Sequence, residues 1–290
     1  MEAFHSFWTE PGRSRNGGSV FFPDYEQLTA ILSSAQWRKH SGRVRMITDT
    51  EGAFFFRESG LDVFWDEVDV LLDPLKGEVD PIAFWAAGKL YALRNMTLPC
   101  VMLDTDLIVW KNVDAKLLGD AVAAHAEPLH PGTYPDPAVF LFRNSYRFPA
   151  EWDFNLNAAN TAFLYLGDTV LRDAYTDAAI RFLRSVETAG TDPVQTMCFA
   201  EQRILPMCAA AEGKNLSFLM QPEEVPEQDF VTHTWGFKQI LRSRPRAREE
   251  FCMRLVRRIA LEHPDQADRL ADCRDLKAYY ARYLAGAQIT

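Results

Sequence analysis

Apolar runs and amphipathic stretches alternate along most of the chain. The apolar runs predict strands over residues 3–8, 43–48, 67–72, 100–110 and 161–166, with further short strands over 121–142. Segments with helical periodicity separate them, over residues 23–37, 51–59, 81–95, 170–186 and 194–200. This alternation predicts an α/β fold with a mostly parallel sheet that is flanked by helices on both faces. In such sheets, ligands bind beyond the carboxyl ends of the strands.

The pattern changes after residue 240. Phe251, Leu255 and Ile259 recur at intervals of four residues, which predicts an amphipathic helix over residues 246–261. Residues 265–284 predict one or two more helices. We therefore expect an α/β domain over residues 1–240 and a helical C-terminal extension over residues 241–290 that packs on it.

Two acids interrupt the apolar run over residues 100–110. Asp104 and Asp106 are separated by a single residue, and burying both without a partner would be costly. In an extended chain, residues two apart project to the same side, so both carboxylates would face one divalent cation such as Mn²⁺ or Mg²⁺. The competing interpretation is that they cap a neighbouring helix or pair with Arg94 or Lys111.

Five other segments accompany this Asp-x-Asp motif. They are residues 45–49 (RMITD), 84–93 (FWAAGKLYAL), 157–165 (NAANTAFLY), 201–202 (EQ) and 232–238 (THTWGFK). In this order the segments resemble those of the GT-A glycosyltransferases that use nucleotide-sugar donors. The resemblance is to the relatives of glycosyltransferase families eight and thirty-two, and it covers residues 1–240. It implies a GT-A, Rossmann-like catalytic domain.

The resemblance implies a metal site formed by Asp104, Asp106 and His233. Asp106 would bind Mn²⁺ or Mg²⁺ directly, and Asp104 would contact the metal or the ribose of the donor. A neutral imidazole is a competent ligand for such ions. The alternative for His233 is a surface histidine or a hydrogen-bonded core histidine.

The resemblance also implies a donor site and a reaction centre. The donor-binding residues would be Thr48, Asp49, Lys89, Asp104, Asn157 and Lys238, and the catalytic residues Glu201, Gln202 and Asn160. Each type has an ordinary structural use as well: an aspartate or asparagine in a turn or cap, a lysine or glutamate on a solvated helix. The chain departs from the family pattern because no Pro-Trp pair follows Lys238. Trp152 and Tyr134 are candidates for stacking on a sugar.

Composition narrows the class of protein. The chain of 290 residues is 48% hydrophobic, which is ample for a large α/β domain or two smaller ones. Its formal net charge of −9 argues against a nucleic-acid partner. Five cysteines without a Cys-x-x-Cys pair indicate a cytoplasmic protein, and no apolar run has the length of a transmembrane segment. The basic run over residues 242–248 is either a solvated surface or a peripheral contact with anionic lipid at the inner face of the membrane.

The sequence thus predicts a metal-dependent glycosyltransferase. It would move a sugar from a nucleoside-diphosphate sugar to a glycan or another hydroxyl acceptor, with retention of configuration as in the resembled families. Two alternatives remain: a nucleotidyltransferase on a similar fold, and a non-catalytic module that binds a nucleotide or a sugar. The first would require a Gly-rich signature that we do not find, and the presence of Asp104, Asp106 and His233 argues against the second.

Overall fold

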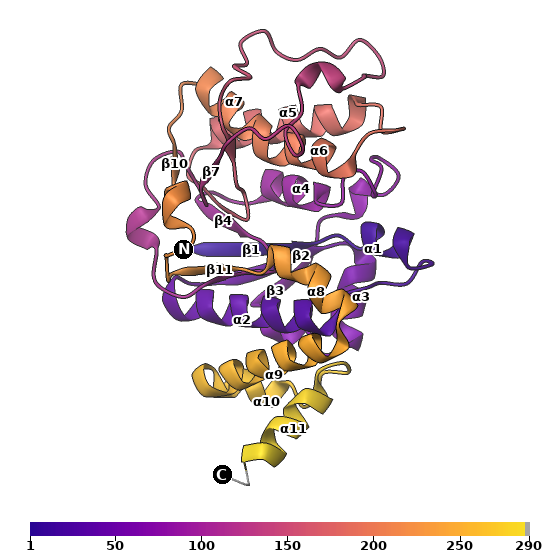
Figure 1. Cartoon of the computed structure of the whole chain (residues 1–290), viewed down its shortest axis with the longest axis vertical. Helices are drawn as coiled ribbons and strands as arrows, with labels where there is room; N and C mark the ends of the chain where they lie inside the picture. The colour runs from indigo at the N-terminus through magenta and orange to yellow at the C-terminus, as the bar shows by residue number, and fades with distance from the viewer. Residues whose placement is uncertain (288–290) are drawn as a thin grey trace.

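A seven-stranded sheet runs through the computed structural model, which describes residues 1–287 (Figure 1). The strand order is β10-β6-β9-β4-β1-β2-β3. β9 is antiparallel to both of its neighbours, and the other neighbouring pairs are parallel. The strands are β1 (Glu2–Phe7), β2 (Val44–Thr48), β3 (Glu67–Val70), β4 (Cys100–Leu103), β6 (Ala121–Ala123), β9 (Phe163–Leu166) and β10 (Leu216–Phe218). The predicted fold class, a mostly parallel α/β sheet flanked by helices, is confirmed.

Two antiparallel ribbons stand outside this sheet. β5 (Leu107–Val109) pairs with β11 (Val231–His233), and β7 (Ala126–Glu127) pairs with β8 (Ala158–Ala159). The first ribbon joins segments that are more than a hundred residues apart in the sequence. It therefore brings the late segment back to the end of β4.

Helices cover both faces of the sheet (Figure 1). One face carries α4 (Ala87–Asn95), α5 (Thr169–Ser185), α6 (Pro193–Cys198) and α7 (Ile204–Ala211); the other carries α2 (Asp24–His40). Because successive strand residues point to opposite faces, Met102 packs on the α4 side and Val101 and Leu103 on the α2 side. The shorter helices α1 (Glu10–Arg15) and α3 (Thr50–Glu58) follow the ends of β1 and β2.

A C-terminal group of helices packs on the outside of α2 (Figure 1). It comprises α8 (Lys238–Ser243), α9 (Pro245–Glu262), α10 (Pro264–Arg269) and α11 (Lys277–Ala287). Leu255 and Ile259 of α9 are buried in the same core as Ile31 of α2. Arg248 and the hydroxyl of Tyr279 both bind the carboxylate of Asp24, each at 2.7 Å. The division at residue 240 stays a prediction.

Three local predictions were wrong. Residues 100–110 do not form one strand: the chain turns at 104–106, and β4 and β5 belong to different sheets. Residues 121–142 contain only the short strands β6 and β7, because four prolines between 128 and 137 remove the N–H groups that a ladder needs. Helix α4 begins at Ala87 rather than at residue 81, and residues 81–86 form tight turns. No helix in the described part of the chain is long and apolar enough to cross a bilayer.

Candidate metal and donor site

The acidic pair lies in the turn that leaves the central sheet. The backbone N–H of Asp104 still donates to the carbonyl of Ala162 at 2.8 Å, which extends the β4–β9 pairing by one residue. The N–H of Leu107 then donates to the carbonyl of Asp104 at 3.0 Å and closes the turn. Asp104 and Asp106 are therefore brought together by a turn, and not by the pleat of a strand as we expected. β1, β2 and β4 run parallel, so this turn lies at the carboxyl edge of the sheet.

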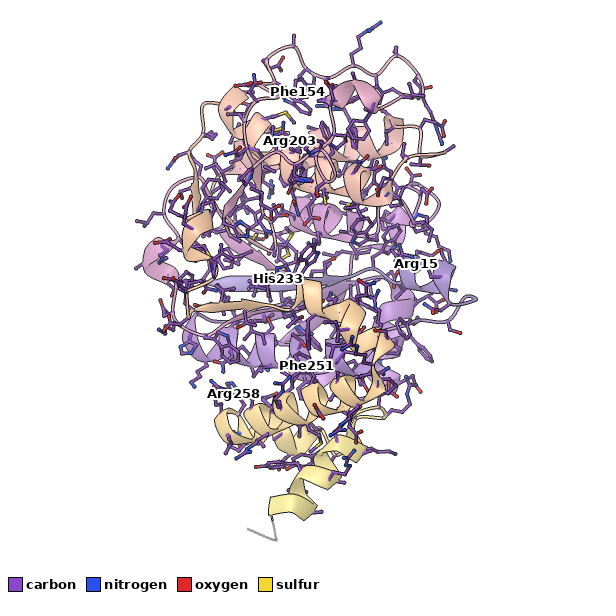
Figure 2. The ribbon with its side chains drawn as sticks, in the orientation of Figure 1. Arg15, Phe154, Arg203, His233, Phe251 and Arg258 are labelled. Atoms are coloured by element: carbon purple, nitrogen blue, oxygen red, sulfur yellow. The ribbon has the colours of Figure 1, made fainter. Side chains whose placement is uncertain are left out.

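The pairing of β11 with β5 places His233 beside the acidic pair. His233 is the last residue of β11 and stands opposite Leu107 of β5, one residue after Asp106. Its Nε2 lies 3.4 Å from Oδ1 of Asp106 and 3.9 Å from Oδ2 of Asp104. One side-chain ligand atom from each of these three residues lies within 4.8 Å of the others. Figure 2 shows His233 near the middle of the molecule, between the two helical layers.

This donor set fits a hard or borderline divalent cation. Two carboxylate groups and one imidazole are ligands that Mn²⁺-type ions accept, and the remaining positions can be completed by water and a substrate phosphate. The three residues predicted as metal ligands thus do converge. Their ligation of a metal stays a proposal.

Two lysines supply the positive charge that faces the acids. Lys89, on α4, contacts both Asp104 and Glu201, the latter at 2.6 Å. Lys238, the first residue of α8, lies 3.0 Å from Oδ2 of Asp106. Both lysines thus belong to the cluster, and Lys238 does so although no Pro-Trp pair follows it.

The acids respond differently to this environment. Burial alone would raise the pKa of Asp106, but the hydrogen bond from His233 and the charge of Lys238 hold it well below its usual range. The pKa of Asp104 is raised, because burial and the nearby carboxylates of Asp106 and Glu201 outweigh the attraction of Lys89. An added cation would relieve the repulsion that Asp104 experiences.

The pKa values of Lys89 and His233 are both raised. Burial favours the neutral forms of Lys89 and His233, yet the neighbouring carboxylates outweigh it and raise both pKa values. Lys89 is therefore held as an ammonium group between two acids.

Glu201 reaches the cluster from an irregular helical turn. Residues Phe199–Arg203 form a π-helical segment between α6 and α7. The buried Glu201 carboxylate accepts hydrogen bonds from Lys89 Nζ at 2.6 Å and from Thr161 Oγ1 at 2.7 Å. Its backbone carbonyl accepts from the hydroxyl of Tyr175 at 2.6 Å. Such π-helical turns occur frequently at functional sites.

Gln202 and Asn160 belong to a second polar network beside the first. Asn160 Nδ2 donates to Oε1 of Glu127 at 2.6 Å, and the hydroxyl of Tyr134 donates to Oε2 at 2.6 Å. The side-chain amide of Gln202 lies 2.5 Å from the same hydroxyl. The amide atom that faces this hydroxyl is Oε1 of Gln202, so the single phenol proton has two acceptors within reach, Gln202 Oε1 and Glu127 Oε2.

Other predicted donor residues lie outside these networks. Asp49 caps α3 through the N–H of Gly52 at 2.8 Å, and it also accepts from the N–H and hydroxyl of Thr9. Thr48 donates its hydroxyl to the carbonyl of Phe7 at 2.6 Å. Asn157 is exposed. No hydrogen bond or ion pair in the described chain joins these three to the acidic cluster, and their contact with a donor stays a prediction.

The two aromatic candidates are packed in the protein. Trp152 is 7% exposed and Tyr134 is 6% exposed. Trp152 packs against Phe148, and the hydroxyl of Tyr134 is used within the second network. Neither presents a free face of the kind that sugar stacking requires.

Three residues in or near the site were not predicted from the sequence: Thr161, Glu127 and His5. Thr161 directly follows Asn160 in the segment 157–165 that the motif order had marked, so its position was a usable signal. No sequence signal pointed to Glu127, because it belongs to no motif. His5 lies behind the site with its ring fully buried, and a chain of hydrogen bonds through Ser33 connects it to the carbonyl of Leu107, next to Asp106.

Comparison with known proteins identifies a family. The profile of a family of unknown function, DUF6734, matches residues 1–273. The chain belongs to this family. No curated protein matches it in sequence.

The solved structures that resemble this DUF6734 chain do so distantly. The apo form of WbbM, a bifunctional glycosyltransferase, has a TM-score of 0.44 at 9% identity over 75% of this chain. This chain covers 38% of the length of WbbM. The glycosyltransferase PaToxG has a TM-score of 0.40 at 10% identity, with 96% of this chain and 85% of PaToxG covered. Mouse xyloside xylosyltransferase 1 in its apo form has a TM-score of 0.38 at 10% identity, with 75% of this chain and 85% of that chain covered.

Proposed function

We propose that this protein is a metal-dependent glycosyltransferase of the GT-A type. It would transfer a sugar from a nucleoside-diphosphate sugar to a glycan or another hydroxyl acceptor, with retention of configuration. The observation that carries the proposal is the convergence of Asp104, Asp106 and His233 within 4.8 Å at the carboxyl edge of the sheet. The order of the accompanying sequence motifs supports the same reading.

The charge of the cluster supports a cation and a polyanionic substrate together. Three carboxylates face two lysine ammonium groups and one imidazole. When a divalent cation is bound there, it supplies neutralisation of the charge that develops on a leaving diphosphate. The preference for Mn²⁺ or Mg²⁺ follows from the oxygen-rich ligand set.

The lysines would orient the donor. Lys238 is the first residue of α8, and in the proposed complex its ammonium group would turn from Asp106 to a phosphate oxygen. Lys89 would remain between Asp104 and Glu201 and fix both carboxylates in place. The residue expected to face the transferred sugar is Glu201, held by Lys89 and Thr161 at the π-helical turn.

The second network would shape the sugar pocket. Asn160 and Gln202 are connected through Glu127 and Tyr134, which fixes the orientation of both amides. A fixed amide can distinguish sugar hydroxyls by donating at one end and accepting at the other. We therefore assign Asn160 and Gln202 to sugar recognition in the proposed reaction.

The five cysteines are free thiols, which agrees with the proposed cytoplasmic location.

Calorimetric titration with nucleotide sugars, with and without Mn²⁺, tests this function. UDP- and GDP-sugars should be compared. We expect one donor class to bind only with the metal and to be hydrolysed slowly to the nucleoside diphosphate in the absence of an acceptor. Absence of metal-dependent binding for every donor would refute the proposal.

A pair of variants ties the signal to the site. Asp106→Asn should abolish metal-dependent binding, whereas Asp114→Asn should leave it unchanged, because Asp114 lies on an exposed turn after β5. Equal binding by both variants would place the donor elsewhere.

A further inference from the structure

An open groove lies between α2, the β5–β11 ribbon and α9. Its volume is about 820 Å³. We call it the α2–α9 groove, and its charged and aromatic walls are Lys39, His40, Trp110, Lys111, Arg254 and Arg258. Arg258 is labelled in Figure 2 on α9, below α2.

The groove and the metal cluster use opposite faces of the same ribbon. Thr232 lines the groove, and the next residue of β11, His233, points to Asp106. Neighbouring residues of a strand project to opposite sides. The groove is therefore a separate site and not an extension of the donor site.

The groove is basic in an acidic protein. Four permanent cations line it, on α2, after β5 and on α9, against the two carboxylates of Asp229 and Glu262. The whole chain has a formal net charge of −9. A local excess of positive charge in such a chain raises the local concentration of anions.

The groove already holds two carboxylate groups. The first, Asp229, lies 2.5 Å from the ammonium group of Lys111. Glu262 contacts the side-chain amide of Gln36, the guanidinium of Arg258 and, at 3.8 Å, the ammonium of Lys39. Donors from two helices thus converge on one oxyanion, which is the arrangement that phosphate recognition also requires. Arg254 makes no ion pair in the described chain, and its guanidinium lies over the ring of Phe251, 5.9 Å from the centroid.

The remaining walls are apolar. Leu32 and Leu255 form a buried floor. Trp110 forms a side wall; the guanidinium of Arg258 lies over its ring at 4.9 Å, and its Nε1 donates to Thr232 at 2.8 Å. A ligand that combines an oxyanion with a ring or hydrocarbon face matches these surfaces.

We infer that the α2–α9 groove binds a phosphate-bearing ligand through Arg254, Lys111 and Arg258. The shared chemistry is a phosphate group next to an apolar or ring-like face, as found in a sugar phosphate or in a lipid headgroup. Asp229 competes with this ligand for Lys111, and Glu262 competes with it for Arg258 and Lys39. The inference does not depend on the proposed glycosyl transfer.

Titration of the full-length protein in the presence of EDTA tests the inference, because the chelator silences the metal site. The probes are inorganic phosphate, glucose 1-phosphate and vesicles of phosphatidylglycerol, with phosphatidylcholine vesicles as the neutral control. Calorimetry follows the soluble probes, and co-sedimentation follows the vesicles. Binding by soluble probes identifies a free phosphate ligand, and binding by phosphatidylglycerol vesicles alone identifies a headgroup. Both results support the inference.

Matched variants locate the binding. A unit charge roughly 6 Å from a bound anion in a wet groove changes the affinity about threefold. Arg254→Ser should weaken binding by about that factor, and Glu262→Gln should strengthen it about threefold by removing the competing carboxylate. Arg257→Ser is the control, since Arg257 is exposed on the same helix and does not line the groove.

The three variants distinguish binding in the groove from binding elsewhere. Opposite effects of the Arg254 and Glu262 variants, with no effect of the Arg257 variant, support the assignment. The inference is overturned if no probe binds, if the two arginine variants lose the same affinity, or if Glu262→Gln weakens binding. Thermal unfolding of each variant identifies any change that comes from loss of the fold.

Discussion

His5 should make the protein less stable at mildly acidic pH. Its ring is fully buried in β1, where Trp65 Nε1 donates to Nδ1 at 3.0 Å. The proton is therefore on Nε2, which donates to Ser33 Oγ at 3.1 Å, and that hydroxyl donates to the carbonyl of Leu107 at 2.5 Å. Burial lowers the pKa of His5 to about 3, although the carboxylate of Asp106 opposes the shift.

The direction and size of the effect follow from proton linkage. Above pH 6.5 the ring is neutral in both the folded and the unfolded chain, so it imposes no penalty. Below pH 6.5 the unfolded chain binds a proton that the folded chain does not, and stability is lost progressively until about pH 3. At pH 5, one and a half units below the unfolded pKa, this amounts to about 2 kcal/mol.

Urea denaturation of wild type and His5→Gln measures this contribution. Glutamine offers one acceptor and one donor group but does not titrate, so both proteins share every other source of pH dependence. Between pH 7.5 and pH 5, the free energy of unfolding of the wild type should fall by about 2 kcal/mol more than that of the variant. Equal losses of unfolding free energy in the two proteins would show that the pKa of His5 is not lowered in the folded chain, and would refute the reasoning.

Three other substitutions have defined outcomes. Lys89→Met should lower the free energy of unfolding by about 3 kcal/mol, because Asp104 and Glu201 lose their shared counter-charge; an unchanged urea midpoint would contradict the ion-pair assignment. Asp49→Ala should cost about 2 kcal/mol, since it removes the cap of α3 and a buried acceptor, and urea denaturation again measures it. Asp106→Asn should abolish Mn²⁺-dependent nucleotide-sugar binding in calorimetry, while circular dichroism shows the fold intact.

The layered fold was predictable because its long elements have strong apolar periods. Helix α5 and strand β2 begin and end within one residue of the predicted bounds. The turn at 104–106 was missed because the apolar residues on both sides of it are equally suited to one continuous strand. What ends the strand is the pairing of β5 with β11, and a contact across more than a hundred residues leaves no local pattern.

The site was predictable only where a motif marked it. Lys89, Asp106 and His233 were found because their segments occur in a recognisable order, although the expected geometry of the acids was wrong. Glu127 was not found, because a single glutamate on a two-residue strand resembles any solvated acid. The residues that orient a site are thus harder to predict than those expected to bind its ligand.

The π-helical turn at Phe199–Arg203 sets a limit on how this chain can vary. A turn of this kind contains one residue more than a regular helix would hold, so shortening the segment by one residue would restore an uninterrupted α-helix from α6 to α7. That change would improve the backbone hydrogen bonding and, at the same time, rotate Glu201 away from Lys89 and Thr161. A chain without the extra residue should therefore keep the fold while losing the arrangement that Glu201 provides.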